Sequence, residues 1–419
     1  MIRFAGGDGI ARRIVLITIA IILIIGIGIN VMGRIYSLIP YQRAISDNIQ
    51  RITFNAQKSI LESMQRIEEE EQPIASEFPG HQAALSSPYL AVQSYSLRND
   101  TTKLSVYNLE TGEEYMVPTS GEYIFSFDIE GANVVWADLR NETRDPVWQE
   151  PLGQHTYNYN KLNWDVFLYN LETKELKQLT RNTAAQRNPR LWQNYVVWED
   201  NREDKTKDYY GIWNIYLYDL GSGEETRITT GESDHINPRI RDGKIVWQDN
   251  RANTGNKYRG CENCPEYNWD IYLYDISAGV EQAVATGPTM ECEPDVSGGL
   301  VVWTEYRDLN NADILMKDLD TGKVTKVAGN TFHQWQPRVD NGYVVWTDES
   351  RGHSINDVNT DFANADVLLY DTRTGNTTRL TGDWIQSRPL ISGLYVAFLN
   401  DTQVNSRYQV IRLPDNLVP

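Results

Sequence analysis

Basic side chains are in the minority in this sequence. It contains 39 Lys and Arg against 57 Asp and Glu, which gives a formal net charge of −18 at pH 7. Nucleic-acid binding is therefore excluded as the main function, because it needs a basic surface. The five histidines are not clustered, which counts against a catalytic site built on histidine. No Gly-x-Ser-x-Gly motif occurs, which excludes a serine peptidase of the α/β-hydrolase type.

Long apolar runs are also lacking, except for one near the N-terminus. From Ile14 to Gly33 no residue is charged, and a helix of this length spans roughly 30 Å, the thickness of one bilayer core. Arg12 and Arg13 precede the run, so the positive-inside tendency places residues 1–13 in the cytoplasm and the rest of the chain outside. We interpret residues 14–33 as a single-pass transmembrane signal anchor in the cell membrane. A cleaved signal peptide is the alternative, although no convincing cleavage site follows.

Residues 34–72 are expected to form an amphipathic stalk helix. Apolar residues recur there at spacings of three and four, at Ile45, Ile49, Ile52, Ala56, Ile60, Met64 and Ile67. This spacing produces one apolar stripe along a helix. The stripe either packs on the chain's own domain or pairs with a second copy, so self-association through the stalk is one expectation.

Residues 73–419 repeat themselves, and the repeats indicate the fold. Five copies of a segment such as "NPRIRDGKIVWQDNR" begin at Phe125, Asn188, Asn237, Glu293 and Gln336. Each is followed by a second unit such as "WNIYLYDLGSGEETRIT" from Trp213. Apolar and polar residues alternate in both units, which is typical of strands. Four strands per repeat, named a to d in chain order, predict an all-β chain folded as a β-propeller.

The ends of the repeat region predict seven blades, with six or eight as alternatives. A first copy around Leu104 carries strands b, c and d, and a last copy from Arg388 carries a, b and c. Residues near Ile74 to Phe78 are expected to supply the missing outer strand and close the ring. Positive φ is expected in the c–d turns, where the sequence places Gly112, Gly223, Gly279, Gly322 and Gly375, and Lys174 in the second repeat.

The segment "VVWEDNR" followed by "NIYLYDLGSGEETRIT" resembles the repeat of TolB-like (WD40-like) propellers, and the resemblance covers about residues 85 to 413. It implies a membrane-anchored member of a family of scaffolds that bind proteins or surface polymers. Two departures stand out. A membrane span and a helix occupy the place of the α/β domain that precedes the propeller in the periplasmic Tol component, and no hydrolase domain follows the last blade.

Acid and base pairs recur at the end of strand b. They are Asp138/Arg140, Asp200/Arg202, Asp249/Arg251 and the more widely spaced Asp348/Arg351. Because a catalytic site is used once, a pair that repeats with the fold is expected to be structural, holding the blades in register. The same reasoning assigns Asp165, Asp270, Asp313 and Asp366 to internal contacts. It assigns Trp136, Trp198, Trp247, Trp303 and Trp346 to packing between blades.

The connections between strands b and c differ from repeat to repeat, which is where binding specificity is expected. Aromatic residues and histidines in them are the predicted binding residues: Trp148, His155, Tyr157, Tyr159, Tyr209, Tyr210, Tyr258, Tyr267 and His353. Such side chains suit contacts with a protein or stacking on sugars. An equal alternative is that they only pack the loops onto the ring.

Three cysteines lie close together along the chain, at Cys261, Cys264 and Cys292. Outside the membrane a disulfide between two of them is the first expectation, with a zinc site or free thiols as alternatives. No other metal ligand set is predicted. The segment from Asp357 to Asp361 has oxygen ligands at alternate positions, but it lacks the rest of an EF-hand loop, so structural calcium is only an alternative.

These observations predict a membrane-anchored propeller outside the cytoplasmic membrane, either periplasmic or extracellular, that binds an envelope protein or a surface glycan without catalysis or cofactor. A polysaccharide lyase or hydrolase with its site in the propeller channel is the alternative from another class. Its mark would be arginine, histidine and carboxylate side chains converging in that channel. A third interpretation is a structural component of an envelope complex or filament.

Overall fold

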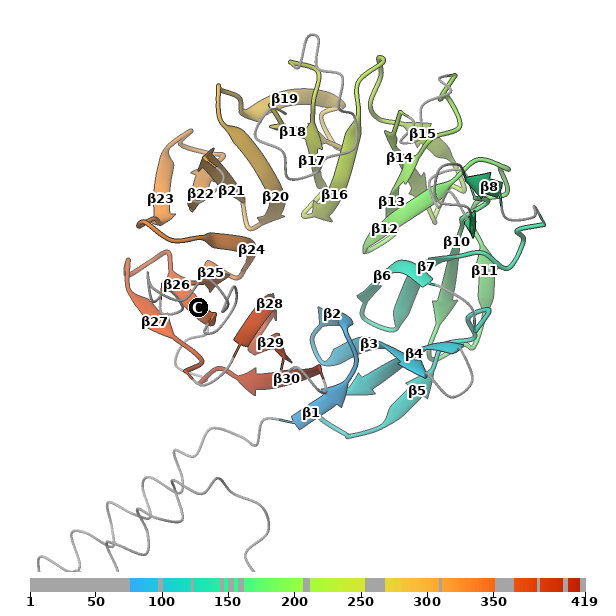
Figure 1. The fold of residues 1–419 in the computed structure, drawn as a ribbon, viewed down its shortest axis with the longest axis horizontal. Helices are drawn as coiled ribbons and strands as arrows, with labels where there is room; N and C mark the ends of the chain where they lie inside the picture. The colour runs from blue at the N-terminus through green and yellow to red at the C-terminus, as the bar shows by residue number, and fades with distance from the viewer. Residues whose placement is uncertain are drawn as a thin grey trace, which may run out of the picture. The chain divides into compact units, whose positions relative to one another are not determined.

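The computed structural model describes residues 76–96, 101–121, 124–143, 147–149, 154–156, 162–205, 212–252, 268–308, 311–350, 365–382, 385–401 and 406–414. Within them the chain forms seven four-stranded antiparallel sheets arranged as blades around a common axis (Figure 1). The prediction of an all-β propeller with seven blades is confirmed. Residues 73–419 form one compact unit.

The first four blades follow the chain. Blade 1 contains β2 (Gln82–Ser86), β3 (Tyr89–Ser96), β4 (Thr101–Asn108) and β5 (Glu114–Met116). Blade 2 contains β6 (Ile124–Glu130), β7 (Asn133–Asp138), β10 (Asp165–Asn170) and β11 (Leu176–Gln178). Blade 3 contains β12 (Gln186–Trp192), β13 (Tyr195–Asp200), β14 (Asn214–Asp219) and β15 (Glu225–Arg227). Blade 4 contains β16 (His235–Arg241), β17 (Lys244–Asp249), β18 (Asp270–Asp275) and β19 (Val280–Ala285).

The last three blades complete the ring. Blade 5 contains β20 (Met290–Ser297), β21 (Leu300–Asp308), β22 (Asn311–Asp318) and β23 (Val324–Ala328). Blade 6 contains β24 (Gln334–Asp340), β25 (Tyr343–Asp348), β26 (Asp366–Asp371) and β27 (Thr377–Arg379). Blade 7 contains β28 (Ile385–Ser392), β29 (Tyr395–Asp401), β30 (Arg407–Arg412) and β1 (Ser76–Pro79). A separate hairpin joins β8 (Val147–Gln149) to β9 (Gln154–Thr156).

The ring is closed by the N-terminal strand of the propeller, as the sequence predicted. Strand β1 pairs antiparallel with β30, and Phe78 lies opposite Tyr408. Glu77 of β1 also forms an ion pair with Arg407, with 2.9 Å between Oε2 and Nη1. The first copy gains an inner strand, β2, that the sequence analysis did not recognise.

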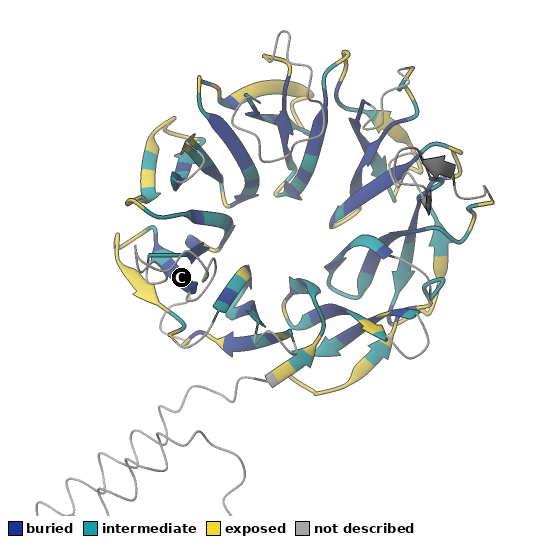
Figure 2. Ribbon diagram, in the orientation of Figure 1, coloured by how far each residue is buried: buried dark blue, intermediate teal, exposed yellow. Residues whose placement is uncertain are grey.

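The five repeated tryptophans of strand b each pack against the preceding blade, which confirms their predicted role. Trp198 of blade 3, for example, shares a cluster with Val135 and Val166 of blade 2. Trp247 of blade 4 contacts residues of blade 3 in the same way. Burial is concentrated in the inner and middle strands, whereas the outer strands are largely exposed (Figure 2). The blades are therefore held mainly by apolar contacts between neighbouring sheets.

The c–d turns have the predicted conformation. In blade 3 the Asp219 carboxylate accepts a hydrogen bond of 2.8 Å from the backbone N–H of Gly221, and Gly223 follows with φ 76°. Glycine tolerates this left-handed region at no steric cost. In blade 2 the equivalent residue is Lys174, with φ 61°. Asn or Asp before the turn therefore fixes the loop, and the residue with positive φ ends it.

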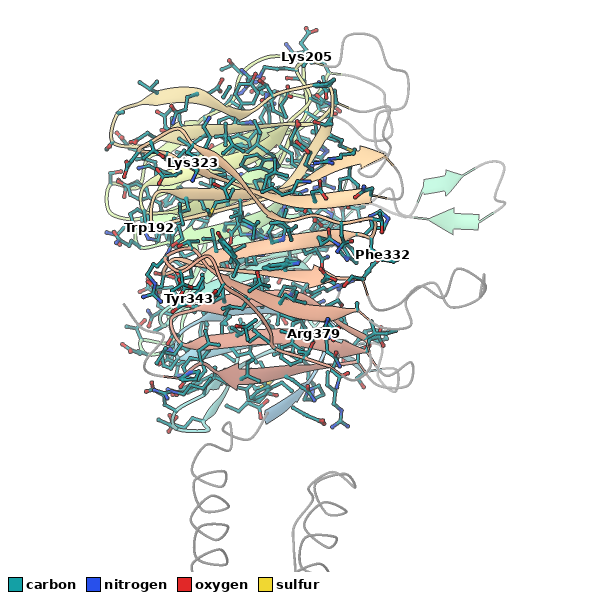
Figure 3. The ribbon with its side chains drawn as sticks, turned by 90° about the vertical axis from the view of Figure 1, so that its left-hand side faces the viewer. Trp192, Lys205, Lys323, Phe332, Tyr343 and Arg379 are labelled. Carbon is teal, nitrogen blue, oxygen red and sulfur yellow. The ribbon has the colours of Figure 1, made fainter. Side chains whose placement is uncertain are left out.

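The antiparallel blades divide the connections between two faces. The a–b and c–d turns share one face, and the b–c and d–a connections share the other. In Figure 3 Trp192, Lys323 and Tyr343 mark the first face, while Phe332 and Lys205 mark the second. We call the second one the b–c face.

In the described part of the chain no helix is long and apolar enough to cross a membrane. The predicted anchor, residues 14–33, and the predicted stalk, residues 34–72, lie outside that part.

Candidate functional site

The inner strands of five blades share a bulge just before a proline. The residues there are not glycine, yet their φ angles lie between 52° and 56°; they are Asn188, Asn237, Glu293, Gln336 and Arg388. The pairing between strands a and b shifts register at each of these places. Proline cannot donate a hydrogen bond to a neighbouring strand, so a bulge accommodates it. Backbone of this kind costs about 1 kcal/mol per residue and is concentrated at functional sites.

Hydrogen bonds between blades hold these bulges in place. The Glu199 carboxylate accepts from the Asn188 amide at 2.7 Å and from the backbone N–H of Asn237 at 2.8 Å. Gln248 accepts from the Asn237 amide at 2.6 Å and from the backbone N–H of Glu293 at 3.0 Å. The Glu293 carboxylate accepts from the next blade, at the backbone N–H of Gln336, at 2.8 Å. The chain of contacts runs through blades 3 to 6 and fixes the inner strands relative to one another.

The inner strands enclose a cavity of about 540 Å³ on the propeller axis. A volume of this size falls within the range of ligand pockets, about 300 to 1,000 Å³. Arginines that line it are Arg187, Arg190, Arg239, Arg241, Arg338 and Arg388. Carboxylates that line it are Asp128, Glu130, Glu199, Asp295 and Asp340. The channel is therefore rich in arginine although the whole chain is strongly acidic.

Three of these arginines occupy the same position of the repeat, directly after the bulge proline: Arg190, Arg239 and Arg338. Burial lowers the pKa of Arg190; the charge of Asp128 opposes this effect, and the Arg338 guanidinium adds to it. Burial also lowers the pKa of Arg239 well below its usual value, and the charges of Arg190 and Arg338 add to that effect. Arginine nevertheless stays protonated at neutral pH. Three positive side chains from blades 3, 4 and 6 therefore face one another in the channel.

The nearby carboxylates bind backbone rather than these guanidinium groups. Asp128 accepts from the backbone N–H of Leu191 at 3.0 Å, and Asp295 accepts from that of Val339 at 2.9 Å. Both contacts join one inner strand to the next. The two carboxylates are thus used to hold the ring, and they reduce the positive charge of the channel only through space.

An ion pair crosses the channel at its a–b end. Arg241 of blade 4 lies 3.1 Å from the Glu130 carboxylate of blade 2 and 3.7 Å from the Asp340 carboxylate of blade 6. Burial raises the pKa of Glu130, while the positive charge of Arg241 opposes that rise. All three residues stand at the ends of their strands, next to the a–b turns. We call them the cross-channel bridge, and they narrow the end of the channel that lies opposite the b–c face.

The repeated acid and base pairs are structural in blades 2, 3 and 4, as predicted. Their distances are 2.7 Å for Asp138/Arg140, 2.5 Å for Asp200/Arg202 and 2.6 Å for Asp249/Arg251. In each case the tryptophan two residues earlier donates its indole N–H to the same carboxylate. Each arginine also lies over an aromatic ring of strand c. Arg351, the partner expected for Asp348, lies outside the described residues.

The acids at the start of strand c also make internal contacts. Asp313 pairs with Arg307 and Lys326, and Asp366 pairs with Arg379. Asp165 accepts from the Asn141 amide at 2.7 Å, and Asp270 accepts from the backbone N–H of Gly287 at 3.3 Å. The prediction that these residues serve the fold therefore agrees with their contacts.

Most of the predicted binding residues lie outside the described part of the chain. This applies to Tyr157, Tyr159, Tyr209, Tyr210, Tyr258, Tyr267 and His353. Trp148 and His155 are paired residues in the register of β8 with β9. Cys292 is buried in β20, whereas Cys261 and Cys264, like the Asp357 to Asp361 segment, lie outside the described residues. The disulfide and the calcium alternative stay predictions. Among the described residues no group of three His, Cys, Asp or Glu could hold a metal ion.

The channel residues are not among the predicted binding residues, all of which lie in the b–c connections. The signal that marks them is the residue after the bulge proline, which is Arg, Arg, Asp, Arg and Leu in blades 3 to 7. The charge at this position differs between blades while the neighbouring positions repeat, which indicates a role beyond the fold. The aligned repeats contain this signal.

A buried carboxyl on blade 5 gives a prediction about pH. Burial raises the pKa of Glu291 from 4.5 to about 7, and the charge of Asp270 adds to the rise. The folded chain therefore holds this proton more tightly than the unfolded chain between about pH 4.5 and 7, so the contribution of Glu291 to stability falls as pH rises through that window. We expect Glu291→Gln to raise the free energy of unfolding by about 1 to 3 kcal/mol at pH 8 and to leave it unchanged at pH 4.5.

Urea unfolding at the two pH values measures this effect. Glu224→Gln is the matched control, because it makes the same change at an exposed position of a c–d turn. If Glu291→Gln raises the free energy of unfolding equally at both pH values, the Glu291 carboxyl does not titrate between them.

Comparisons with known proteins support the fold. No known family profile matches the sequence, and no curated protein matches it. Among solved structures, an acylaminoacyl peptidase from Pyrococcus horikoshii aligns at TM-score 0.53 and 13% identity, over 81% of this chain and 52% of that chain. An oligogalacturonate lyase from Vibrio parahaemolyticus aligns at TM-score 0.52 and 12% identity, over 82% and 92%. A putative TolB from Agrobacterium tumefaciens aligns at TM-score 0.42 and 14% identity, over 75% and 99%. At such identities the likeness concerns the β-propeller fold alone.

Proposed function

We propose that this protein is a non-catalytic binding module of the cell envelope that receives part of its ligand in the propeller channel. The observation that carries the proposal is the cavity itself, since inner strands of all seven blades bring polar and charged side chains to it. Repeated residues elsewhere in the blades are used for the fold, whereas the lining differs from blade to blade. A lining of this kind suits recognition of one orientation of one ligand.

The proposal also covers the membrane anchor and the class of ligand. Residues 14–33 would hold the protein in the membrane with the propeller outside, and the ligand would be a surface glycan or a segment of an envelope protein. The ligand would approach the channel from the b–c face, because the cross-channel bridge narrows the other end. Loop residues such as Trp148 and His155 would add contacts on that face.

A glycan and peptidoglycan binding screen with the full-length protein in detergent micelles tests the proposal. Leu390 lines the channel, and Leu390→Trp would occupy part of the cavity. We expect that variant to bind any ligand found by the screen at least tenfold more weakly than the unmodified protein.

The matched control is Leu176→Trp, the same change at an exposed position of β11. It should bind as the unmodified protein does. Equal binding by both variants would place the ligand elsewhere and end the proposal of a channel site.

The second candidate is a polysaccharide lyase or hydrolase, and one observation favours it. Arginine and carboxylate side chains do converge in the channel, which is part of the mark expected of such an enzyme. Histidine is not among the described residues that line the cavity. Incubation with acidic polysaccharides, followed by a reducing-end assay, separates the two candidates. Turnover by the unmodified protein that Leu390→Trp abolishes would replace the binding proposal with the enzymatic one.

A further inference from the structure

The arginines of the described residues differ in whether they pair with a carboxylate. Nine of them form ion pairs with carboxylates in the described part of the chain: Arg140, Arg187, Arg202, Arg241, Arg251, Arg307, Arg373, Arg379 and Arg407. Of the six arginines that line the channel, Arg187 and Arg241 belong to these nine, whereas Arg190, Arg239, Arg338 and Arg388 form no ion pair with a described carboxylate. Arg388 donates instead to the His81 carbonyl at 3.1 Å. A buried or half-buried guanidinium normally has such a partner, because desolvation of an unpaired charge is costly.

The hydrogen bonds of Arg190, Arg239 and Arg338 leave donors unused. Arg190 donates from Nη1 to the Pro189 carbonyl at 2.8 Å and, at 3.5 Å, to the Phe127 carbonyl of blade 2. Arg338 donates from Nη1 to the Pro337 carbonyl at 2.7 Å. The buried Nε of Arg190 has no partner among the described residues. The Arg239 guanidinium donates no hydrogen bond to the described residues. A guanidinium has five N–H donors, so most donors of these three cavity-lining side chains have no acceptor among the described residues.

The fold brings the three charges together although nothing in blade packing requires them. The position after the bulge proline is Asp295 in blade 5 and Leu390 in blade 7. Each of these two blades forms a four-stranded sheet without an arginine there. The cluster therefore costs folding free energy through mutual repulsion while the scaffold does without it elsewhere. Residues that oppose stability in this way are typical of binding sites, where the ligand supplies the missing interaction.

We propose that Arg190, Arg239 and Arg338 form a site for an oxyanion group of the ligand, a carboxylate or a phosphate, held in the channel between the bulges and the cross-channel bridge. The proposal rests on the proposed channel function and names the chemistry of that site. Arginine matches both groups through paired N–H donors. The acidic surface of the chain would exclude long polyanions, so a single acidic group or a small acidic molecule fits better than an extended one.

Thermal unfolding of the full-length protein in detergent micelles, followed by tryptophan fluorescence, tests the site. The probes are sodium citrate for carboxylates and sodium pyrophosphate for phosphates, each compared with sodium chloride at equal ionic strength. We expect at least one probe to raise the midpoint by a few degrees in a saturable way, because a ligand that binds only the folded state stabilises it. A larger response to citrate assigns the carboxylate, and a larger response to pyrophosphate assigns the phosphate.

The informative variant is Arg239→Met, with Arg338→Met as a second one should the first not fold. Removing one charge is expected to raise the midpoint without any anion and to raise the half-saturating concentration of the probe at least tenfold. Arg181→Met, the same change at an exposed position, should behave as the unmodified protein does. A purely structural role for Arg239 predicts the opposite sign, a lower midpoint without anion.

The proposal is overturned if neither probe moves the midpoint, if all variants respond alike, or if Arg239→Met is destabilised and keeps the full response. Its failure is distinct from failure of the channel function. A screened ligand that is lost by Leu390→Trp but kept by Arg239→Met would retain the channel site and remove the oxyanion. A ligand that both variants keep would remove the channel site itself.

Discussion

Replacing Asp249 with alanine is expected to lower the free energy of unfolding by about 3 to 5 kcal/mol. Its fully buried carboxylate accepts from the Trp247 indole at 3.0 Å and from Arg251 Nη2 at 2.6 Å. It also lies 3.3 Å from Nε2 of the buried His235. The substitution would leave the buried Trp247 indole N–H without its acceptor, and Arg251 would keep only its ion pair with Glu281. Urea unfolding followed by tryptophan fluorescence measures the loss.

Two further variants show whether the effect belongs to the fold. Asp200→Ala should cost a similar amount, because Asp200 accepts from Trp198 and Arg202, the equivalent tryptophan and arginine of blade 3. Asp275→Ala removes a carboxylate from an exposed c–d turn and should cost about 1 kcal/mol or less. A loss below 1 kcal/mol for Asp249→Ala would contradict the structural role of the repeated pairs. Retained stability with lost ligand binding would point to a functional one.

Removing the closing strand is expected to have the second large effect. Replacing residues 76–79 with Gly-Ser-Gly-Ser would abolish the strand preference of β1, the ion pair of Glu77 with Arg407, and the packing of Phe78 on Tyr107, whose ring centroids lie 4.8 Å apart. Loss of the aromatic contact alone costs about 2 kcal/mol, and the total should reach about 3 to 4 kcal/mol. The exposed edge of β30 should also promote association between copies.

Equilibrium unfolding and size-exclusion chromatography measure the two consequences. The matched control replaces residues 377–379 of β27, an outer strand that does not join the ends of the ring, with Gly-Ser-Gly. Its cost should be clearly smaller, and it should not associate through blade 7. If both replacements lower the free energy of unfolding equally, ring closure by β1 stabilises the protein no more than any other outer strand does.

The repeat explains why so much of this fold could be predicted. The same sequence pattern recurs in each blade. The aligned copies therefore predict the strands around Trp198 and Trp247 and the glycine of the c–d turn. They also predict the missing outer strand near Phe78. The pairing of β1 with β30 joins residues about 330 apart in sequence, yet it followed from counting strands at the two ends.

The channel could not be predicted in the same way. The contact of Arg241 with Glu130 joins blades that are not neighbours, and no local pattern indicates it. The bulge at Asn237 sets the course of the inner strand, and its left-handed φ angle is not what a strand pattern with Asn before Pro suggests. Repulsion between Arg190, Arg239 and Arg338 depends on three blades at once. Such features arise from closure of the ring, which sequence periodicity does not describe.

A crystal structure of the protein grown with citrate or pyrophosphate, whichever gives the larger thermal response, tests the central claim most directly. The account predicts an anion in the channel with its oxygens within hydrogen-bond distance of at least two of Arg190, Arg239 and Arg338. An anion bound only outside the channel, with these guanidinium groups turned toward protein carboxylates, would contradict it.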